Sequence, residues 1–208
     1  MIMLFRMGCR CLLSISKPQN IRLMTQIIDF PFISLDGRIN DRDGKIDFHN
    51  PDDEILSFVN ERHAAFSNHI YDDSTYEIMK WWENPSGPES KLEVIQKYTR
   101  IWNKTHKTVI SKQLSGLDPD QYTVLPELTA DALSELKQKA SSDILIGGSD
   151  LTIAALNFGL LNRIDLMTVP VILGGGDSFF EKIPRTELNL LETRSFKKGW
   201  IFSSYEIK

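Results

Sequence analysis

The chain has 208 residues, of which 24 are Lys or Arg and 28 are Asp or Glu, and its net charge is −4. With 41% hydrophobic and 25% charged residues, it has the composition of a globular protein long enough to bury a real core. The acidic balance argues against a general nucleic-acid binder, which needs a basic face. The two cysteines, Cys9 and Cys11, lie near the start, so the body cannot hold a disulfide framework or a cysteine-based zinc site.

Residues 1–24 differ from the rest because they contain four basic residues and no acid, which leaves residues 25–208 with 20 basic and 28 acidic residues. Three interpretations stay open for this segment: an organelle-type presequence, a secretory signal, or an unstructured extension ahead of a start at Met24. Arg6 and Arg10 interrupt the apolar run and argue against the secretory signal.

We therefore expect an N-terminal extension over residues 1–24, either disordered or absent from the mature chain, and one domain over residues 25–208. No stretch reaches the roughly 18–20 apolar residues that a membrane span needs. We predict a cytoplasmic protein, with organelle targeting by residues 1–24 as the alternative.

The first half of the body alternates strand and helix patterns. Residues 27–35 form an apolar run that predicts a buried strand ending at an Asp36–Gly37 turn. Pro51 begins a predicted helix with acids in its first turn. The patterns that follow predict strands at 69–71, 107–111 and 122–125 and helices at 74–82, at 92–102 and after a Thr129 cap.

The second half continues this alternation and ends in a hairpin. Residues 143–146 predict a strand that runs into Gly147–Gly148, and the helix expected over 151–161 is apolar almost all round, which predicts burial. A strand pattern over 163–173, broken by Pro170, leads to three glycines at 174–176. The last two strands, 187–196 and 200–206, are joined by a short turn and must be antiparallel. Together the patterns predict an α/β domain with a mixed, mostly parallel sheet.

The segment DILIGGSDL (143–151) is the strongest local signal, because a buried strand meets two glycines and then a helix. Free N–H groups and a partial positive charge at such a helix start can bind a phosphate. The segment is neither the G-x-G-x-x-G dinucleotide fingerprint nor a P-loop. A pyrophosphate site and a tight turn capped by Ser149 or Asp150 therefore both stay open.

Two other glycine segments follow predicted strands. In VILGGGDSFF (171–180), three consecutive glycines indicate either a ligand close to the backbone or a close crossing of two chain segments. In SLDG (34–37), Asp36–Gly37 is either a plain turn or a ligand contact at the end of a strand.

These segments, with STYE (74–77) and VIS (109–111), follow one another in an order that resembles the dihydrofolate-reductase-like family, which includes the reductase domain of bacterial riboflavin biosynthesis. The resemblance covers roughly residues 26–206. It implies a three-layer α/β/α sandwich around a mixed sheet, NADPH or NADH as cofactor, and no nucleic-acid or membrane partner. A homodimer is implied by the resemblance alone.

The resemblance further implies hydride transfer to a small heterocycle, as in 5-amino-6-(5-phosphoribosylamino)uracil reductase or dihydrofolate reductase. The candidate cofactor-binding residues that it implies are Asp73, Thr75, Ser111, Lys112, Gly147, Gly148, Ser149, Asp150, Leu151, Gly174 and Gly175. Asp36 and Gly37 are the candidate substrate-binding residues.

One departure from the family pattern affects the cofactor. Asp72 and Asp73 stand where the family commonly has Gly-Arg, and that arginine would pair with the 2′-phosphate of NADPH. Asp73 would repel this phosphate and could accept a hydrogen bond from a ribose hydroxyl, while Lys112 offers a compensating charge. NADPH preference is therefore in doubt, and NADH use or lost cofactor binding stays open.

For the acid that such a reaction often needs, we select Asp53 as the catalytic candidate, although acids also simply favour a helix start. His49, His63, His69 and His106 lack metal-ligand spacing, so we expect surface or core roles for them and no metal site. The alternative function is a non-catalytic nucleotide-binding or dimer-scaffold member of the same fold.

Overall fold

The computed structural model describes residues 25–208, so Cys9, Cys11 and the three interpretations of residues 1–24 lie outside the described part. Within that part, one nine-stranded sheet has the order β5-β4-β3-β6-β1-β7-β9-β8, and β2 pairs with β7 beyond the end of β1. The strands are β1 (Ile27–Asp29), β2 (Phe32–Ser34), β3 (Asn68–Asp72), β4 (His106–Ile110), β5 (Tyr122–Leu125), β6 (Ile144–Gly147), β7 (Arg163–Val169), β8 (Leu188–Ser195) and β9 (Ile201–Ile207).

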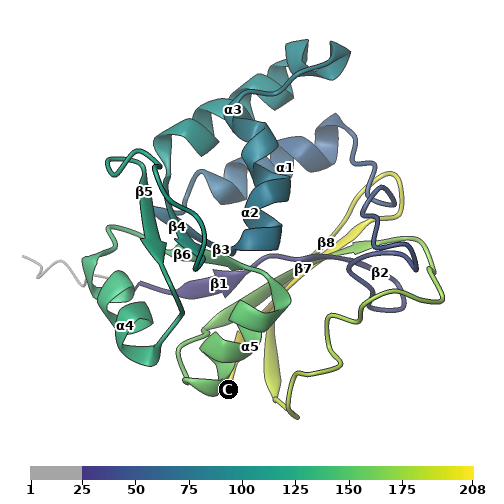
Figure 1. Cartoon of the computed structure of the whole chain (residues 1–208). Helices are drawn as coiled ribbons and strands as arrows, with labels where there is room; N and C mark the ends of the chain where they lie inside the picture. The colour runs from purple at the N-terminus through teal and green to yellow at the C-terminus, as the bar shows by residue number, and fades with distance from the viewer. Residues whose placement is uncertain (1–24) are drawn as a thin grey trace, which may run out of the picture.

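Helices cover both faces of the sheet (Figure 1). On one face lie α1 (Asp53–His63), α2 (Asp73–Met79) and α3 (Glu93–Lys104), with short 3₁₀ turns at Lys80–Glu83 and Pro88–Lys91; on the other lie α4 (Ala130–Lys139) and α5 (Ser149–Asn157). Each face has its own apolar core, built around Phe58 and Trp102 on the first and around Leu133 and Ala155 on the second. The predicted three-layer α/β/α sandwich is confirmed.

Eight of these strands run in one direction, and β9 runs in the opposite one. The pairs β1–β6, β1–β7, β2–β7, β3–β4, β3–β6 and β4–β5 are all parallel, and only β9 is antiparallel to its neighbours β7 and β8. The carboxyl ends of the parallel strands therefore share one edge of the sheet, which we call the carboxyl edge. The predicted mixed sheet with an antiparallel hairpin at the end is confirmed.

The strand expected over residues 27–35 is two strands. Pro31 lies between β1 and β2 and has no N–H to donate to a ladder, although its carbonyl accepts from Met167 at 3.0 Å. Before the proline the chain pairs with both β6 and β7, and after it with β7 alone. The chain thus leaves β6 at the carboxyl edge, beside Gly147.

Three further expectations need correction. The helix expected from Pro51 begins at Asp53, with Asp52 as its N-cap. The strand pattern over 163–173 ends at Val169, before Pro170. The helix expected to be buried over 151–161 ends at Asn157, and only one side of it is buried, because α5 packs on the sheet and no further layer covers its outer side.

Thr129 caps α4 as predicted, with its hydroxyl oxygen accepting from the Ala132 N–H at 3.1 Å. Among residues 25–208, no helix has both the length and the apolar character that crossing a bilayer requires.

Candidate functional site

The carboxyl edge has a topological switch point between the neighbouring strands β3 and β6. The helix after β3 is α2, on one face of the sheet, and the helix after β6 is α5, on the opposite face (Figure 1). The starts of both helices therefore meet outside the ends of two adjacent strands. Ligands of open α/β sheets usually bind in such a crevice.

Two glycines make this meeting sterically feasible. A Cβ on Gly147 would lie 2.9 Å from Cε1 of Tyr71, and a Cβ on Gly148 would lie 2.2 Å from Oδ2 of Asp72. Gly148 also has φ of +110°, which disfavours any residue with a side chain. Positions 147 and 148 thus accept only glycine without rearrangement of β3 and the start of α2.

Of the two interpretations of DILIGGSDL, the structure contradicts the capped turn. No side chain of residues 25–208 caps α5 at Gly148, and the backbone N–H groups of Ser149, Asp150 and Leu151 donate no hydrogen bond within this part of the chain. The Asp150 carboxylate instead pairs with Lys182 at 3.2 Å, in an exposed position. The Leu151 side chain is buried in the core, so only its backbone could serve a ligand.

The family-implied residues of α2 lie beside these glycines. Asp72 is the N-cap of α2: its Oδ1 accepts from the Thr75 N–H at 2.7 Å and from the Ser74 hydroxyl at 2.8 Å. The Thr75 hydroxyl lies 3.3 Å from where a Cβ of Gly148 would be, so Thr75 belongs to the same small region. Asp73 is the first residue of α2 and is exposed.

Ser111 and Lys112 follow β4, two strands from β6 on the same edge. Ser111 is buried, and its hydroxyl oxygen accepts from the N–H groups of Gln113 at 3.1 Å and Leu114 at 2.9 Å, which holds the turn after the strand. Lys112 is exposed. Both stay predicted cofactor contacts, and the structure adds a local structural role for Ser111.

The SLDG and GGG segments hold each other. Asp36 accepts from the backbone N–H groups of Leu173 at 3.1 Å and Gly174 at 2.9 Å, and from the Ser34 hydroxyl at 2.7 Å. These bonds stabilise the charged form, and the hydrogen bond from Ser34 is the largest cause that lowers the pKa of Asp36 to about 2. The carboxylate is thus occupied by a loop-to-loop contact, while its substrate role stays a prediction.

The same pair of loops explains the third glycine. A Cβ on Gly176 would lie 2.0 Å from the backbone oxygen of Asn40, and Gly176 has φ of +95°. Gly175 packs against the side chain of Arg42, which donates to the Gly174 carbonyl at 2.9 Å. Of the two explanations for the three glycines, the close crossing of two chain segments is confirmed, and the cofactor role of Gly174 and Gly175 stays a prediction.

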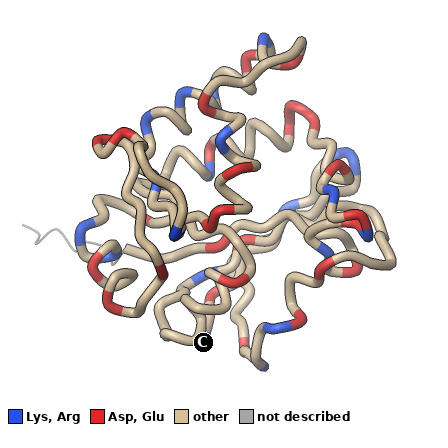
Figure 2. The backbone as a smooth tube through the Cα atoms, viewed as in Figure 1, with Lys and Arg blue, Asp and Glu red and all other residues tan. Residues whose placement is uncertain are grey.

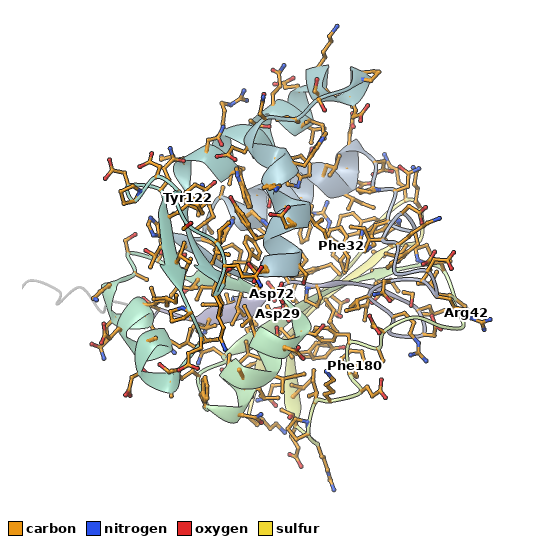
Figure 3. All side chains as sticks on the ribbon, in the orientation of Figure 1. Asp29, Phe32, Arg42, Asp72, Tyr122 and Phe180 are labelled. Carbon is orange, nitrogen blue, oxygen red and sulfur yellow. The ribbon has the colours of Figure 1, made fainter. Side chains whose placement is uncertain are left out.

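Asp29 is a site residue that sequence reasoning missed. It ends β1 beside Ile146 of β6 and is 3% exposed; Figure 3 labels it together with Asp72. Its Oδ2 is 2.7 Å from the hydroxyl of Thr152 on α5, and that hydroxyl is 3.1 Å from the Gly148 carbonyl. The available signal was a single acid inside an apolar run that we predicted to be a buried strand.

Burial raises the pKa of Asp29 to about 7, and nearby Asp165 adds to the shift. The Thr152 hydroxyl donates to Oδ2 of Asp29 and also has the Gly148 carbonyl in reach as an acceptor. The bond to Asp29 favours the charged carboxylate and so offsets part of the effect of burial. The charge state of Asp29 is therefore coupled to the glycine turn at the start of α5.

An aromatic group lines β2 on the α1 side of the sheet. The ring of Phe32 lies 5.5 Å from that of His49 and 5.7 Å from that of Trp200, and His49 Nε2 is buried with no partner in the described part of the chain. Burial lowers the pKa of His49 to about 4, so its imidazole is neutral at pH 7.

Asp53 is exposed at the start of α1, while a buried oxygen of the next residue, Glu54, has no partner within residues 25–208. Glu54 is a second acidic candidate that sequence reasoning missed. The other histidines make protein contacts: His63 Nδ1 lies 2.6 Å from the Tyr98 hydroxyl, and His69 is fully buried. Residues 25–208 contain no cluster of three potential metal ligands.

We expect Asp29→Asn to stabilise the protein at high pH. A group with a raised pKa contributes stability below its unfolded pKa and loses it as pH rises through its folded pKa, so the wild type should weaken between about pH 4 and pH 7. An amide cannot ionise and can donate to Thr152 at every pH. Chemical unfolding should show a gain approaching about 4 kcal/mol at about pH 9 and almost none at about pH 4.

The control for this prediction is Asp131→Asn, which neutralises an exposed acid in the first turn of α4. It should follow the wild-type pH profile. Identical profiles for the wild type and Asp29→Asn would contradict the buried, proton-binding carboxyl.

Comparison with known proteins agrees with this architecture. The uncharacterized protein YyaP of Bacillus subtilis is 25% identical over 188 residues, which cover 86% of this chain and 93% of YyaP. A putative riboflavin biosynthesis protein from Shewanella sp. PV-4 superposes with a TM-score of 0.66 at 20% identity, over 88% of this chain and 99% of that one.

A diaminohydroxyphosphoribosylaminopyrimidine deaminase/5-amino-6-(5-phosphoribosylamino)uracil reductase from Thermotoga maritima superposes with a TM-score of 0.62 at 13% identity, over 89% of this chain and 57% of that one. At these identities the two structures show the shared fold. The model of the RibD C-terminal domain matches residues 86–202, which is more than half of the chain. The chain therefore belongs to the RibD C-terminal domain family.

Proposed function

We propose that this chain is an NAD(P)H-dependent reductase of a small heterocycle, in the manner of 5-amino-6-(5-phosphoribosylamino)uracil reductase. The observation that carries the proposal is the uncapped start of α5, which lies behind two obligatory glycines at the topological switch point. A helix start of this kind binds phosphate through its N–H groups and its dipole. The name of the Thermotoga relative and the family membership support the choice of reaction.

The chain's own residues would bind and orient the cofactor. The backbone N–H groups of residues 149–151 would take the pyrophosphate, and Thr75 would contribute a hydroxyl from the opposite helix. When bound, the dinucleotide supplies the hydride, while the protein supplies position and electrostatics. Gly147 and Gly148 would let the dinucleotide approach the backbone closely.

The substrate would lie toward β2, where Phe32 offers an aromatic surface and the neutral His49 has an unpartnered nitrogen. Asp36 and Gly37 follow β2 and border this side. Asp53 is our proposed acid at the start of α1, with Glu54 as the neighbouring candidate.

The alternative is a nucleotide-binding or scaffold protein of the same fold without catalysis. Asp72 favours it, because its carboxylate lies against Gly148. The first experiment below tests the NAD(P)H binding that the reductase requires and that a scaffold without a nucleotide site lacks.

Millimolar NADPH or NADH should raise the melting temperature by several degrees, because a ligand that binds only the folded state stabilises it by about 2.7 kcal/mol at one hundred times its Kd. Differential scanning fluorimetry at constant ionic strength measures this. If neither nucleotide shifts the transition, the reductase proposal fails.

Asp73→Arg should improve NADPH affinity relative to NADH, because the exposed first residue of α2 then carries a cation for the 2′-phosphate. Calorimetric titration of both nucleotides gives the ratio of Kd values, which should shift about tenfold toward NADPH. Glu93→Arg makes the same charge change at the first residue of α3 and should leave the ratio unchanged. An unchanged ratio in Asp73→Arg would refute the placement of Asp73 beside the adenosine ribose.

We also propose that two copies associate through β8. This strand ends the sheet, all eight of its residues are exposed, and Leu190 and Leu191 are 57% and 54% exposed. An open edge strand with exposed apolar residues is a ready partner for another strand.

Size-exclusion chromatography with light scattering should therefore report a dimer that dissociates in Leu190→Lys. Ile78→Lys, at an equally exposed apolar position on α2, should remain dimeric. A wild-type monomer at about 100 μM would contradict the proposal, because a stable dimer has a Kd well below that concentration.

A further inference from the structure

Asp72 places its two carboxylate oxygens in different surroundings. Oδ1 caps α2 by accepting from Thr75 and Ser74. Oδ2 faces Gly148, where it lies 2.2 Å from the position that a Cβ would occupy, and it accepts no hydrogen bond from residues 25–208. One side chain therefore completes the start of α2 and brings an unpaired anionic oxygen to the N-cap of α5.

The start of α5 is the place where an anion is favoured, because its first N–H groups have no acceptor in the described part of the chain and the helix dipole adds partial positive charge. Asp72 already supplies an anion at that place. Figure 2 shows acidic positions at the starts of both α2 and α5, so a phosphate arriving there meets negative charge.

We propose that Asp72 is a built-in anion that lies beside the phosphate seat at α5 and limits the affinity of that seat for the pyrophosphate of a dinucleotide. This inference rests on the proposed function, since it concerns the same seat. It adds that the charge of one residue sets how tightly the chain binds its cofactor.

The neighbouring acids do not have this position. Asp73 is one residue further, exposed, and accepts no hydrogen bond from residues 25–208. Asp150 pairs with Lys182, so its charge is partly compensated. Only Asp72, among these three, lies in contact with the glycine at the N-cap of α5.

The test is Asp72→Asn, which removes the charge while keeping a side-chain oxygen that can cap α2 nearly as well. Asp72→Ser is a second neutral capping variant, which keeps the test valid if the first folds poorly. The control is Asp73→Asn, which removes one charge from the adjacent position. Titration calorimetry of all four proteins uses NADH, which has no 2′-phosphate, inorganic pyrophosphate and, for comparison, NADPH.

Either neutral variant at position 72 should bind NADH and pyrophosphate about tenfold more tightly than the wild type, because a like charge beside the seat is removed. Asp73→Asn should change both affinities less than about threefold, because its exposed charge is more strongly screened. Equal gains in affinity from the variants at positions 72 and 73 would overturn the inference. They would show that the general negative charge of the region limits binding, and not the particular position of Asp72.

The remaining outcomes separate the inference from the proposed function. Unchanged affinities in both position-72 variants, with NADH bound by the wild type, would overturn the inference and leave the reductase standing. Tighter pyrophosphate binding in the position-72 variants, when neither NADH nor NADPH binds any of the four proteins, would support the inference and overturn the reductase. No binding of pyrophosphate, NADH or NADPH to any of the four proteins would overturn both.

Discussion

The contact between Asp72 and Gly148 joins the two halves of the structure at the carboxyl edge. β3 and β6 are neighbours, but their helices leave to opposite faces, so the starts of α2 and α5 must pass each other in very little space. Only a residue without a Cβ fits at position 148, at a φ of +110°. Because that glycine has no side chain, the carboxylate of Asp72 can cap α2 and still lie against α5. The geometry of the candidate site depends on this one contact.

A buried acid, Asp29, also lies close to the same glycine. Asp29 reaches Gly148 through the hydroxyl of Thr152, and its raised pKa means that a proton is shared there near neutral pH. Acidic side chains thus approach this edge from two directions, Asp72 as the cap of α2 and Asp29 at the end of β1, where burial raises its pKa to about 7. Ordinary dinucleotide seats favour an arriving anion. In the site that we propose, the protein's own acids oppose an arriving anion at the start of α5. The charge of these acids is then the main determinant of phosphate affinity.

The loops after β2 and β7 are held together by contacts that involve the backbone of one or both loops. The Asp36 carboxylate fastens the turn after β2 to the segment after β7, and Gly176 lets the two loops cross at Asn40. A ligand is not needed to explain Gly176, because the close crossing alone requires it. These contacts join the two loops that follow β2 and β7, on the side where we propose that the substrate binds.

Local patterns predicted much of the fold. Alternating strand and helix signals, the final hairpin and the Thr129 cap are all present, because hydrophobic periodicity and capping depend on residues close together in the chain. Pro31 and Pro170 shortened strands at points where the apolar runs continued, since apolar character does not reveal a missing N–H. The apolar sequence after Gly148 predicted a fully buried helix, but burial depends on how many layers cover it.

The sequence by itself determined the α/β class, the glycine turn at 147–148 and the two acids in place of Gly-Arg. Only the tertiary structure decided what these residues do. Asp72, and not Asp73, is the acid beside Gly148. Asp36 connects two loops by hydrogen bonds to Leu173 and Gly174, and Asp29 contacts Thr152. Each of these partners lies 76 or more residues away in the chain, and a contact over that distance is set by strand order and helix direction. Those come from packing the whole sheet, which no local pattern contains.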